Sequence, residues 1–239
     1  MKVAVLGAGV IGVTTAYELA RDGHEVTIIE RLAEAAAETS FANAGLFSPG
    51  HAYTWASPKA PKILLRSLYK DGQALRFKPS LDPALWLWSA QFLRNCTAER
   101  ARINTQRKVR LCLYSQQRLQ MVAADTGVAY HGRQGGLLYL YRSRESFARG
   151  TANTAILRDE GLELRPVTAS EAARIDPALE PVKHKFAGAI HCPSDESGDC
   201  RVFTHGLAAH AAEKYAVTFR YGTEITGFEA RAARGLAAR

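Results

Sequence analysis

The chain has 239 residues, of which 47% are hydrophobic, so it can form one large domain or two modest ones with real cores. Its 31 Lys and Arg residues outnumber its 23 Asp and Glu residues, for a net charge of +8, but no nucleic-acid motif accompanies the excess. No apolar run approaches the roughly 18 residues of a membrane span. We therefore expect a soluble or peripheral protein with no nucleic-acid partner.

The first thirty residues predict a strand, a tight glycine turn, a helix and a second strand. Residues 2–6 form an apolar, β-rich run, residues 7–12 read Gly-Ala-Gly-Val-Ile-Gly, and residues 14–21 continue as a helix. A second apolar run, 25–29, ends at Glu30, which follows Gly12 by 18 residues. An acid about 20 residues after this glycine motif is typical of a dinucleotide-binding βαβ unit.

Each glycine of such a unit has a physical role. Gly7 makes the tight turn, Gly9 lets the backbone approach a pyrophosphate, and Gly12 lets the helix pack on the strand. The pyrophosphate is expected at the helix N-terminus, where free N–H groups and the helix dipole favour an anion. Glu30 would accept hydrogen bonds from ribose hydroxyls and disfavours NADP, whereas the glycine motif alone does not separate FAD from NAD. The candidate cofactor-binding residues are Gly7, Ala8, Gly9, Val10, Ile11, Gly12 and Glu30.

A secretory signal is the alternative interpretation of the N-terminus. Glu18, Arg21 and Asp22 interrupt its apolar stretch too early, and no small-residue cleavage site follows. This interpretation is therefore rejected.

The cysteines do not predict a metal site. None of them shows CxxC spacing, and reduced cytosolic thiols are expected: Cys96, Cys112, Cys192 and Cys200. The last two bracket an acidic loop near His184 and His191. Without paired short spacings, no metal is predicted there.

Small and polar residues dominate the segment 39–50, which follows the predicted dinucleotide unit. Glycine and asparagine let the backbone approach a ligand closely and offer N–H donors. A contact with a phosphate or a ring is predicted around Asn43 and Gly45. The next segment, 51–61, is rich in proline and aromatic residues and is expected to be an irregular connector.

Two helices are predicted in the middle of the chain. Residues 82–95 form the first, with Asp82 as N-cap and Pro83 at the first helical position. Residues 97–125 form the second, which Gly127 ends. Basic residues recur over 94–118, where they predict either a solvated helix face or attraction to an anionic membrane. The tryptophans of the first helix are expected in the core or as membrane-facing anchors.

The rest of the chain alternates predicted strands and helices. Thr168 and Glu171 form a capping box that opens a short helix ending before Asp176. Helices are also expected at 143–160 and 201–215. Strands are expected at 128–130, 137–141, 187–192, 217–221 and 224–228, the last two rejoining the first sheet.

Several motifs together resemble one family. They are GAGVIG at 7–12, Glu30-Arg31, ETSFANAGLFSPG at 38–50, LRNC at 93–96, GRQGG at 132–136 and PSDESGDC at 193–200. This combination is similar to the amino-terminal part of the FAD-dependent D-amino acid dehydrogenases, within the wider D-amino acid oxidase and glycine oxidase superfamily. The resemblance extends to about residue 228.

The resemblance implies an α/β fold. A Rossmann-like FAD-binding domain would comprise 1–50 and 186–239, and an α+β substrate domain, 51–185, would be inserted in it. The segment 48–51 would lie near the flavin. Independently of the resemblance, Arg133 is weighed as a partner of a substrate carboxylate, although a structural salt bridge is the favoured role for it. Further cofactor contacts would come from Arg31, Ser40, Asn43, Ala44, Gly45, Leu46 and Ile225.

The activity implied is oxidative deamination of D-amino acids to 2-oxo acids and ammonium, with electrons passed to a respiratory acceptor. The chain would be cytoplasmic, with peripheral contact to the inner face of the membrane. No catalytic side chain is assigned. An amine oxidase of the glycine or sarcosine type is the alternative enzyme.

The later parts of the family fold are absent from this chain, and the tail after Phe228 is compositionally biased toward Ala, Arg and Gly. We expect an unpaired edge in the cofactor sheet and exposed apolar surface. A non-catalytic FAD-binding fragment, or a subunit that needs a partner chain, is therefore a third alternative.

Overall fold

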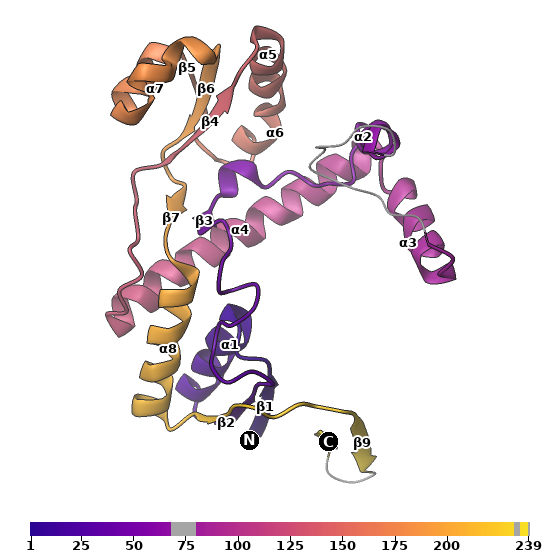
Figure 1. The fold of residues 1–239 in the computed structure, drawn as a ribbon, viewed down its shortest axis with the longest axis vertical. Helices are drawn as coiled ribbons and strands as arrows, with labels where there is room; N and C mark the ends of the chain where they lie inside the picture. Colours follow the sequence, from indigo (N-terminus) through magenta and orange to yellow (C-terminus); the bar gives the residue numbers. More distant parts are fainter. Residues whose placement is uncertain (68–79, 232–234, 239) are drawn as a thin grey trace. The chain divides into compact units, whose positions relative to one another are not determined.

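The computed structural model describes residues 1–67, 80–231 and 235–238 (Figure 1). They divide into two compact units, which we describe separately. Unit 1 comprises residues 1–47, 118–133 and 196–239, and unit 2 comprises residues 48–117 and 134–195. The predicted domain division, with its boundaries at residues 50 and 185, stays a prediction.

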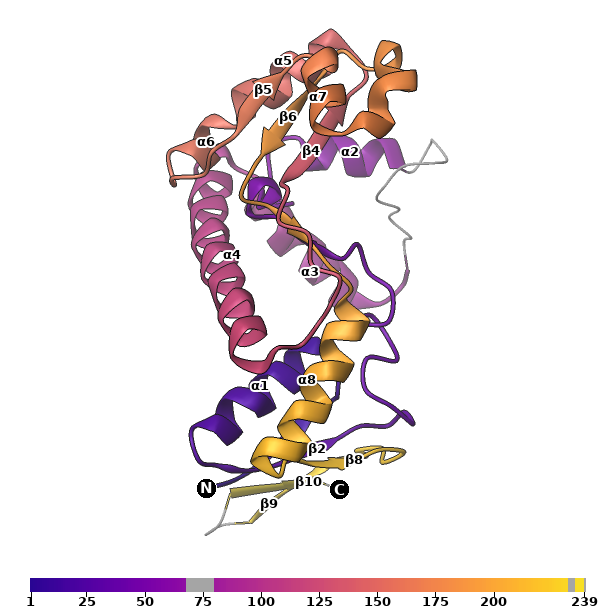
Figure 2. The ribbon, with the colours of Figure 1, turned by 90° about the vertical axis from the view of Figure 1, so that its left-hand side faces the viewer.

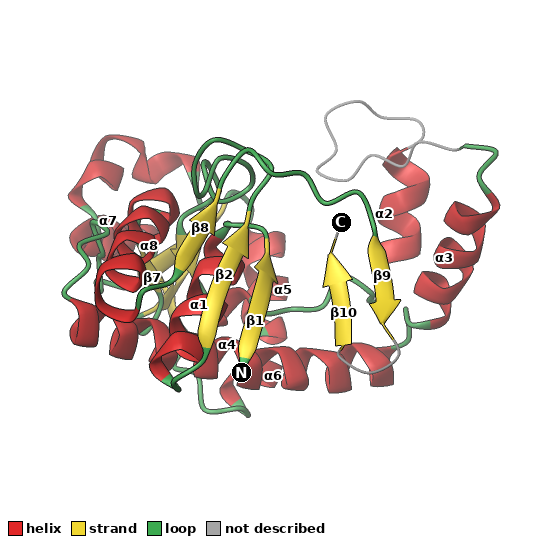
Figure 3. Ribbon diagram, turned by 90° about the horizontal axis from the view of Figure 1, so that it is seen from below, coloured by secondary structure: helices red, strands yellow, loops and turns green. Residues whose placement is uncertain are grey.

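Unit 1 is built on a parallel sheet of three strands in the order β1-β2-β8 (Figure 3). β1 (Lys2–Leu6) and β2 (Glu25–Ile29) match the predicted strands at these positions. β8 (Thr218–Arg220) lies within the predicted strand 217–221. The helices α1 (Val10–Arg21) and α8 (Cys200–Tyr215) pack side by side on one face of the sheet (Figure 2).

Alternation along the strands decides which face of this sheet is covered. Val26 and Ile28 point toward the helices and are fully or almost fully buried, together with Tyr17 and Leu207. On the other face Leu6 is 46% exposed. Among the described residues, β1 is paired on one side only. The predicted open edge and apolar surface are thus present in the described part of the chain.

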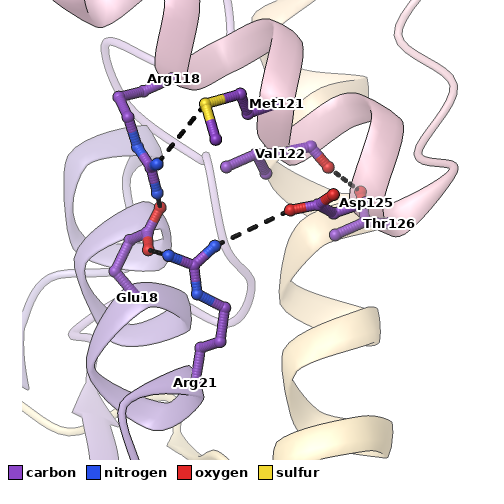
Figure 4. Close-up of polar contacts among 7 residues, drawn as sticks. All are labelled: Glu18, Arg21, Arg118, Met121, Val122, Asp125 and Thr126. Atoms are coloured by element: carbon purple, nitrogen blue, oxygen red, sulfur yellow. Dashed lines mark hydrogen bonds and ion pairs between the residues drawn. The ribbon is translucent and has the colours of Figure 1, made fainter.

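The last turns of α4 (Ala98–Thr126) pack on the core of unit 1 through Leu119 and Val122. A chain of ion pairs joins these turns to α1 (Figure 4). Glu18 accepts from Arg118 and lies 2.7 Å from Arg21, whose other nitrogen is 3.8 Å from Asp125. These groups are partly solvated, so the network adds modestly to the packing.

Two of the strands predicted in unit 1, at 128–130 and 224–228, are wrong. Residues 128–130 form no ladder with any described strand. Tyr130 O accepts from Asp199 N at 2.7 Å, and Arg133 forms an isolated bridge with Ser197. Residues 224–227 are not a strand either. β9 (Phe228–Arg231) pairs antiparallel with β10 (Gly235–Ala238), not with the first sheet. A short antiparallel pair, β3 (Leu46–Phe47) with β7 (Glu196–Ser197), completes the unit.

Unit 2 contains an antiparallel sheet in the order β4-β6-β5. β4 (Leu137–Tyr141) and β6 (Gly188–Cys192) match the predictions, and β5 (Arg165–Val167) is a short addition. The predicted helix 143–160 is divided at Thr154 into α5 (Arg144–Asn153) and α6 (Ala155–Arg158). The predicted capping box is confirmed and opens α7 (Ala169–Ile175), which is followed by a 3-10 helix, η2 (Pro177–Lys185).

The first part of unit 2 holds a 3-10 turn, η1 (Pro49–His51), and the helices α2 (Ala60–Ser67) and α3 (Pro83–Arg94). The predicted start of α3 is confirmed, because the Asp82 carboxylate accepts from Ala84 N at 2.8 Å and Pro83 follows the cap. α4 contributes residues 98–117 to the core of this unit, where Val109 packs with Leu157 and Ile190.

Candidate cofactor-binding site

The glycine turn between β1 and α1 requires glycine at two of its positions. Gly7 has φ +96°, a conformation that L residues rarely adopt, and its N–H donates to Ile29 O at 2.8 Å. A Cβ at Gly12 would lie 1.9 Å from Gly7 O. The helix therefore approaches the turn more closely than any side chain would permit.

The N-terminus of α1 is suited to an anion. Gly9 is its N-cap and has no side chain to cap the helix, and no acidic residue lies in the first turn. The first backbone N–H groups of a helix have no intrahelical acceptor, and they carry the positive end of its dipole. Ser40 Oγ accepts one of them, from Val10, at 3.0 Å. Ile11, at the same end, has a side chain that is 76% exposed.

Glu30, at the end of β2, binds the glycine turn to the segment that follows β2. One carboxylate oxygen accepts from Ala8 N at 2.7 Å, and the other accepts from Leu32 N at 2.9 Å. The Glu30 backbone also bonds to Arg220 O and Thr223 N, both at 2.9 Å. The acid predicted from spacing thus lies beside the turn, and residues 220–223 lie next to it.

The remaining predicted contacts are distributed around this centre. Arg31 forms an ion pair with Glu38, and hydrogen bonding to that carboxylate raises the pKa of the guanidinium. Ser40 is buried, and a Cβ at Gly9 would lie only 3.3 Å from its Oγ. Ile225 is half-buried. The structure therefore brings Ser40 directly to the glycine turn.

A separate pocket of about 490 Å³ in unit 1 contains three of the predicted residues, Asn43, Ala44 and Gly45. Gly45 has φ +59°, and its N–H donates to Asn43 Oδ1 at 2.8 Å. Gly45 O accepts from Gly198 N at 2.8 Å, and a Cβ at Gly45 would lie 2.5 Å from Gly198 O. Leu46 follows in β3 and pairs with Ser197. At Gly45 and Gly198 the pocket wall therefore consists of closely packed backbone, as expected where a ligand approaches closely.

Sequence reasoning missed the other side of this pocket, formed by His131, Asp199 and Cys200 together with Ser197 and Gly198. Asp199 caps α8 by accepting from Val202 N at 2.9 Å. The signal was available in PSDESGDC, because an Asp before an apolar helical run predicts an N-cap. Nothing in the sequence, however, places that cap opposite residues 43–45.

Unit 2 has its own polar centre, around the fully buried Asp195. Its carboxylate accepts from Gly50 N at 2.9 Å and from the Tyr139 hydroxyl at 2.5 Å. His51 is exposed and stacks on Tyr139, with ring centroids 5.3 Å apart. Burial and the Asp195 carboxylate raise the pKa of Tyr139, and burial raises the pKa of the nearby Cys192 thiol to about 11. This centre fixes the turn 49–51.

Arg133 is exposed, and among the described residues no carboxylate forms an ion pair with it. Its backbone bonds to Ser197, with its N–H 2.8 Å from Ser197 O. The favoured role predicted for it, a structural salt bridge, therefore finds no partner in the described part of the chain. Within that same part, no three His, Cys, Asp or Glu side chains are grouped as metal ligands.

Comparison with known proteins identifies the family of this chain. The family described as "FAD dependent oxidoreductase" matches residues 2–239. This chain belongs to the FAD-dependent oxidoreductase family. The family's cofactor is FAD. The glycine turn, the N-terminus of α1 with glycine as its N-cap, and Glu30 fit a dinucleotide of this kind.

One curated relative, "D-amino acid dehydrogenase 2" of Mesorhizobium japonicum, is 46% identical over 229 residues, which are 96% of this chain and 55% of that protein. The chain therefore spans about half the length of this relative. Among solved structures, L-alpha-glycerophosphate oxidase of Mycoplasma pneumoniae with FAD bound matches with a TM-score of 0.66 at 16% identity, covering 99% of this chain and 48% of that one. Glycine oxidase of Bacillus cereus matches with a TM-score of 0.61 at 18% identity, covering 99% and 52%. These two likenesses concern the fold.

Proposed function

We propose that this chain is the FAD-binding and substrate-binding amino-terminal part of a D-amino acid dehydrogenase. In this reaction a D-amino acid loses two electrons and two protons to give an imino acid, which water hydrolyses to a 2-oxo acid and ammonium. The electrons pass to a respiratory acceptor. The observation that carries the proposal is the 46% identity to the Mesorhizobium japonicum enzyme over 96% of this chain.

The residues of unit 1 hold the cofactor in this proposal. The N–H groups at the start of α1 bind the pyrophosphate, and Glu30 orients the adenosine ribose beside residues 220–225. The backbone of 40–46 contacts the flavin half. Bound FAD supplies the two-electron chemistry, while the protein provides binding and orientation.

Arg133 is the side chain we assign to the substrate carboxylate. A guanidinium binds a carboxylate through two parallel hydrogen bonds, and this one is exposed and has no ion-pair partner among the described residues. Replacing Arg133 by Ala should raise KM by about tenfold and leave FAD binding unchanged, whereas Arg133→Lys should recover part of the loss.

The test of the activity supplies FAD, D-alanine and an artificial electron acceptor to the purified chain. Reduction of the acceptor by the D-isomer and formation of pyruvate and ammonium are expected. Reduction by L-alanine alone would contradict the substrate class. Peroxide formation from glycine or sarcosine without another acceptor would favour the amine-oxidase alternative.

A second candidate function, FAD binding without turnover, is supported by the 55% coverage of the relative and by the open edge of β1. In this case the chain is a subunit that needs a partner polypeptide to complete the site. Adding residues of the relative that follow the matched region should then restore turnover to a chain that already holds FAD. Turnover by the chain alone would rule this candidate out.

We also propose a cytoplasmic location with peripheral contact to the inner face of the cell membrane, where respiratory acceptors reside. None of the helices in the described part of the chain combines the length and hydrophobicity that crossing a bilayer requires. Any contact made by these helices would therefore be at the membrane surface.

A further inference from the structure

The helix α3 of unit 2 is apolar on nearly all sides and yet is not buried. Its sequence is PALWLWSAQFLR, and none of its twelve residues is buried. Trp86 is 51% exposed, Leu87 65% and Trp88 57%. A soluble helix normally buries its apolar stripe and presents polar residues to water. α3 therefore has an apolar surface that the described residues leave uncovered.

α2 adds a second set of exposed apolar side chains, interleaved with cations. Ile63 and Leu65 are 40% and 58% exposed, and Lys62 and Arg66 are exposed beside them. Both helices lie away from the sheet of their unit, and α3 leads along the chain into the first turn of α4 (Figure 1). We call the exposed side chains of residues 59–66 and 86–94 the α2–α3 surface.

The charge of this surface has one sign. Neither 55–67 nor 83–94 contains an Asp or Glu, and four exposed cations flank the apolar side chains: Lys59, Lys62, Arg66 and Arg94. None of the four pairs with a carboxylate of the described residues. Trp, Leu and Ile beside Lys and Arg is the composition of helices that lie in a membrane interface.

From these observations we infer that the α2–α3 surface binds an anionic lipid bilayer, with the tryptophans at the level of the headgroups. The backbone of both helices is hydrogen-bonded internally, so only side chains need to enter the interface. The inference deepens the membrane contact included in the proposed function. It does not depend on the substrate, because no turnover is involved in binding.

The chain offers a direct reporter of this binding. It has three tryptophans, Trp86 and Trp88 on the surface and Trp55 just before α2, and Trp55 is 72% exposed. The full chain is titrated with vesicles of phosphatidylglycerol and phosphatidylcholine, and with phosphatidylcholine vesicles as the neutral comparison. A blue shift of the emission is expected with the anionic vesicles, together with quenching by brominated acyl chains. Added salt should weaken the binding.

Two pairs of variants separate this surface from others. Trp86→Ser with Trp88→Ser should weaken co-sedimentation with anionic vesicles by more than about tenfold. The matched control changes Leu111 and Tyr114, which are 67% and 60% exposed on α4, to Ser and should bind normally. Lys62→Gln with Arg66→Gln should weaken binding about fivefold per cation removed. Arg142→Gln with Arg144→Gln removes the same charge elsewhere on unit 2 and is expected to have a smaller effect.

Three results would overturn the inference. The first is an unchanged emission with anionic vesicles at low salt, in a chain that circular dichroism shows to be folded. The second is a control variant that loses as much binding to anionic vesicles as the α2–α3 variant with which it is paired. The third is a dimer in sedimentation velocity whose tryptophan emission is already blue-shifted without lipid, because a second copy would then cover the surface. Turnover of D-alanine is measured separately, so failure of the activity leaves this result intact.

Discussion

Two carboxylates organise the loops of this protein, one in each unit, and they differ in how far their partners lie along the chain. Glu30 accepts from the N–H of Leu32, two residues away, and of Ala8, 22 residues away. Asp195 accepts from Gly50, 145 residues away, and from Tyr139, 56 residues away. Glu30 is half-buried, whereas Asp195 is fully buried.

The difference explains why one was predicted and the other was not. Glu30 belongs to a local βαβ unit in which the order of strand, turn and helix fixes the position of the acid. Asp195 acquires its partners only when β4, β6 and the turn 49–51 assemble. It also follows that water can replace the partners of Glu30 more readily than those of Asp195.

The largest expected effect tests the close packing beside Glu30. In Gly12→Ala the new Cβ would lie 1.9 Å from Gly7 O, so the turn must open. We expect the free energy of unfolding to fall by about 3 kcal/mol and FAD binding to be lost. Gly227→Ala is the control, because a Cβ there meets nothing within 4 Å. Chemical denaturation would measure the free energy of unfolding of the two variants, and flavin titration their FAD binding. Normal FAD binding by Gly12→Ala would contradict the assigned role of the turn.

Removing the buried carboxylate comes next. Asp195→Ala leaves the Gly50 N–H and the Tyr139 hydroxyl without an acceptor, at a cost of about 2–3 kcal/mol. Asp195→Asn keeps one oxygen and should cost less, and Tyr139→Phe should cost about 1 kcal/mol. Because the two groups share one hydrogen bond, a double-mutant cycle in urea should show coupling between them. Additive effects would mean that the bond does not stabilise the turn.

In contrast to Asp195, replacing Glu30 should change the free energy of unfolding little and the affinity for FAD more. Glu30→Ala is expected to lower the free energy of unfolding by about 1 kcal/mol, because water reaches the released N–H groups. FAD affinity should fall by about tenfold, since the ribose partner is lost. Glu30→Gln retains an acceptor and should lie between the two. A loss of stability as large as that of Asp195→Ala would contradict the comparison.

The smallest expected effect concerns a solvent-exposed carboxylate, Glu171. It accepts from the Thr168 N–H at 2.7 Å and from its hydroxyl at 2.8 Å, and these hydrogen bonds lower the pKa of Glu171 below its ordinary value. The unfolded pKa is about 4.3, so this contribution is fully present above that pH and is lost as the pH falls through the lower folded pKa. Glu171→Gln should remove this part of the acid dependence, as thermal unfolding between pH 5 and pH 3 would show, and an unchanged profile would exclude it. Thr168→Ala keeps the backbone N–H donor and should remove only the share of the hydroxyl.

Local signals predicted much of the fold. The βαβ unit, the cap of α3 and the capping box of α7 were predicted because their determinants lie within a few residues of one another. The strand at 128–130 was predicted wrongly, because an apolar run indicates extended backbone but does not specify a partner.

The candidate site was also only partly predictable from the sequence. The glycine turn and Glu30 follow a spacing rule, and the structure brings Ser40 to the turn through Val10. His131, Asp199 and Cys200 reach the pocket beside residues 43–45 only through the pairing of β3 with β7. That pairing spans about 150 residues, and no local pattern encodes it.

The most direct test of the central claim is a titration of the purified chain with FAD, followed by visible absorbance after removal of free flavin. We expect retained flavin bands at about one FAD per chain, and their loss in Gly12→Ala but not in Gly227→Ala. A folded chain that stays colourless, or equal retention by both variants, would contradict the assignment of the glycine turn and Glu30 to the cofactor.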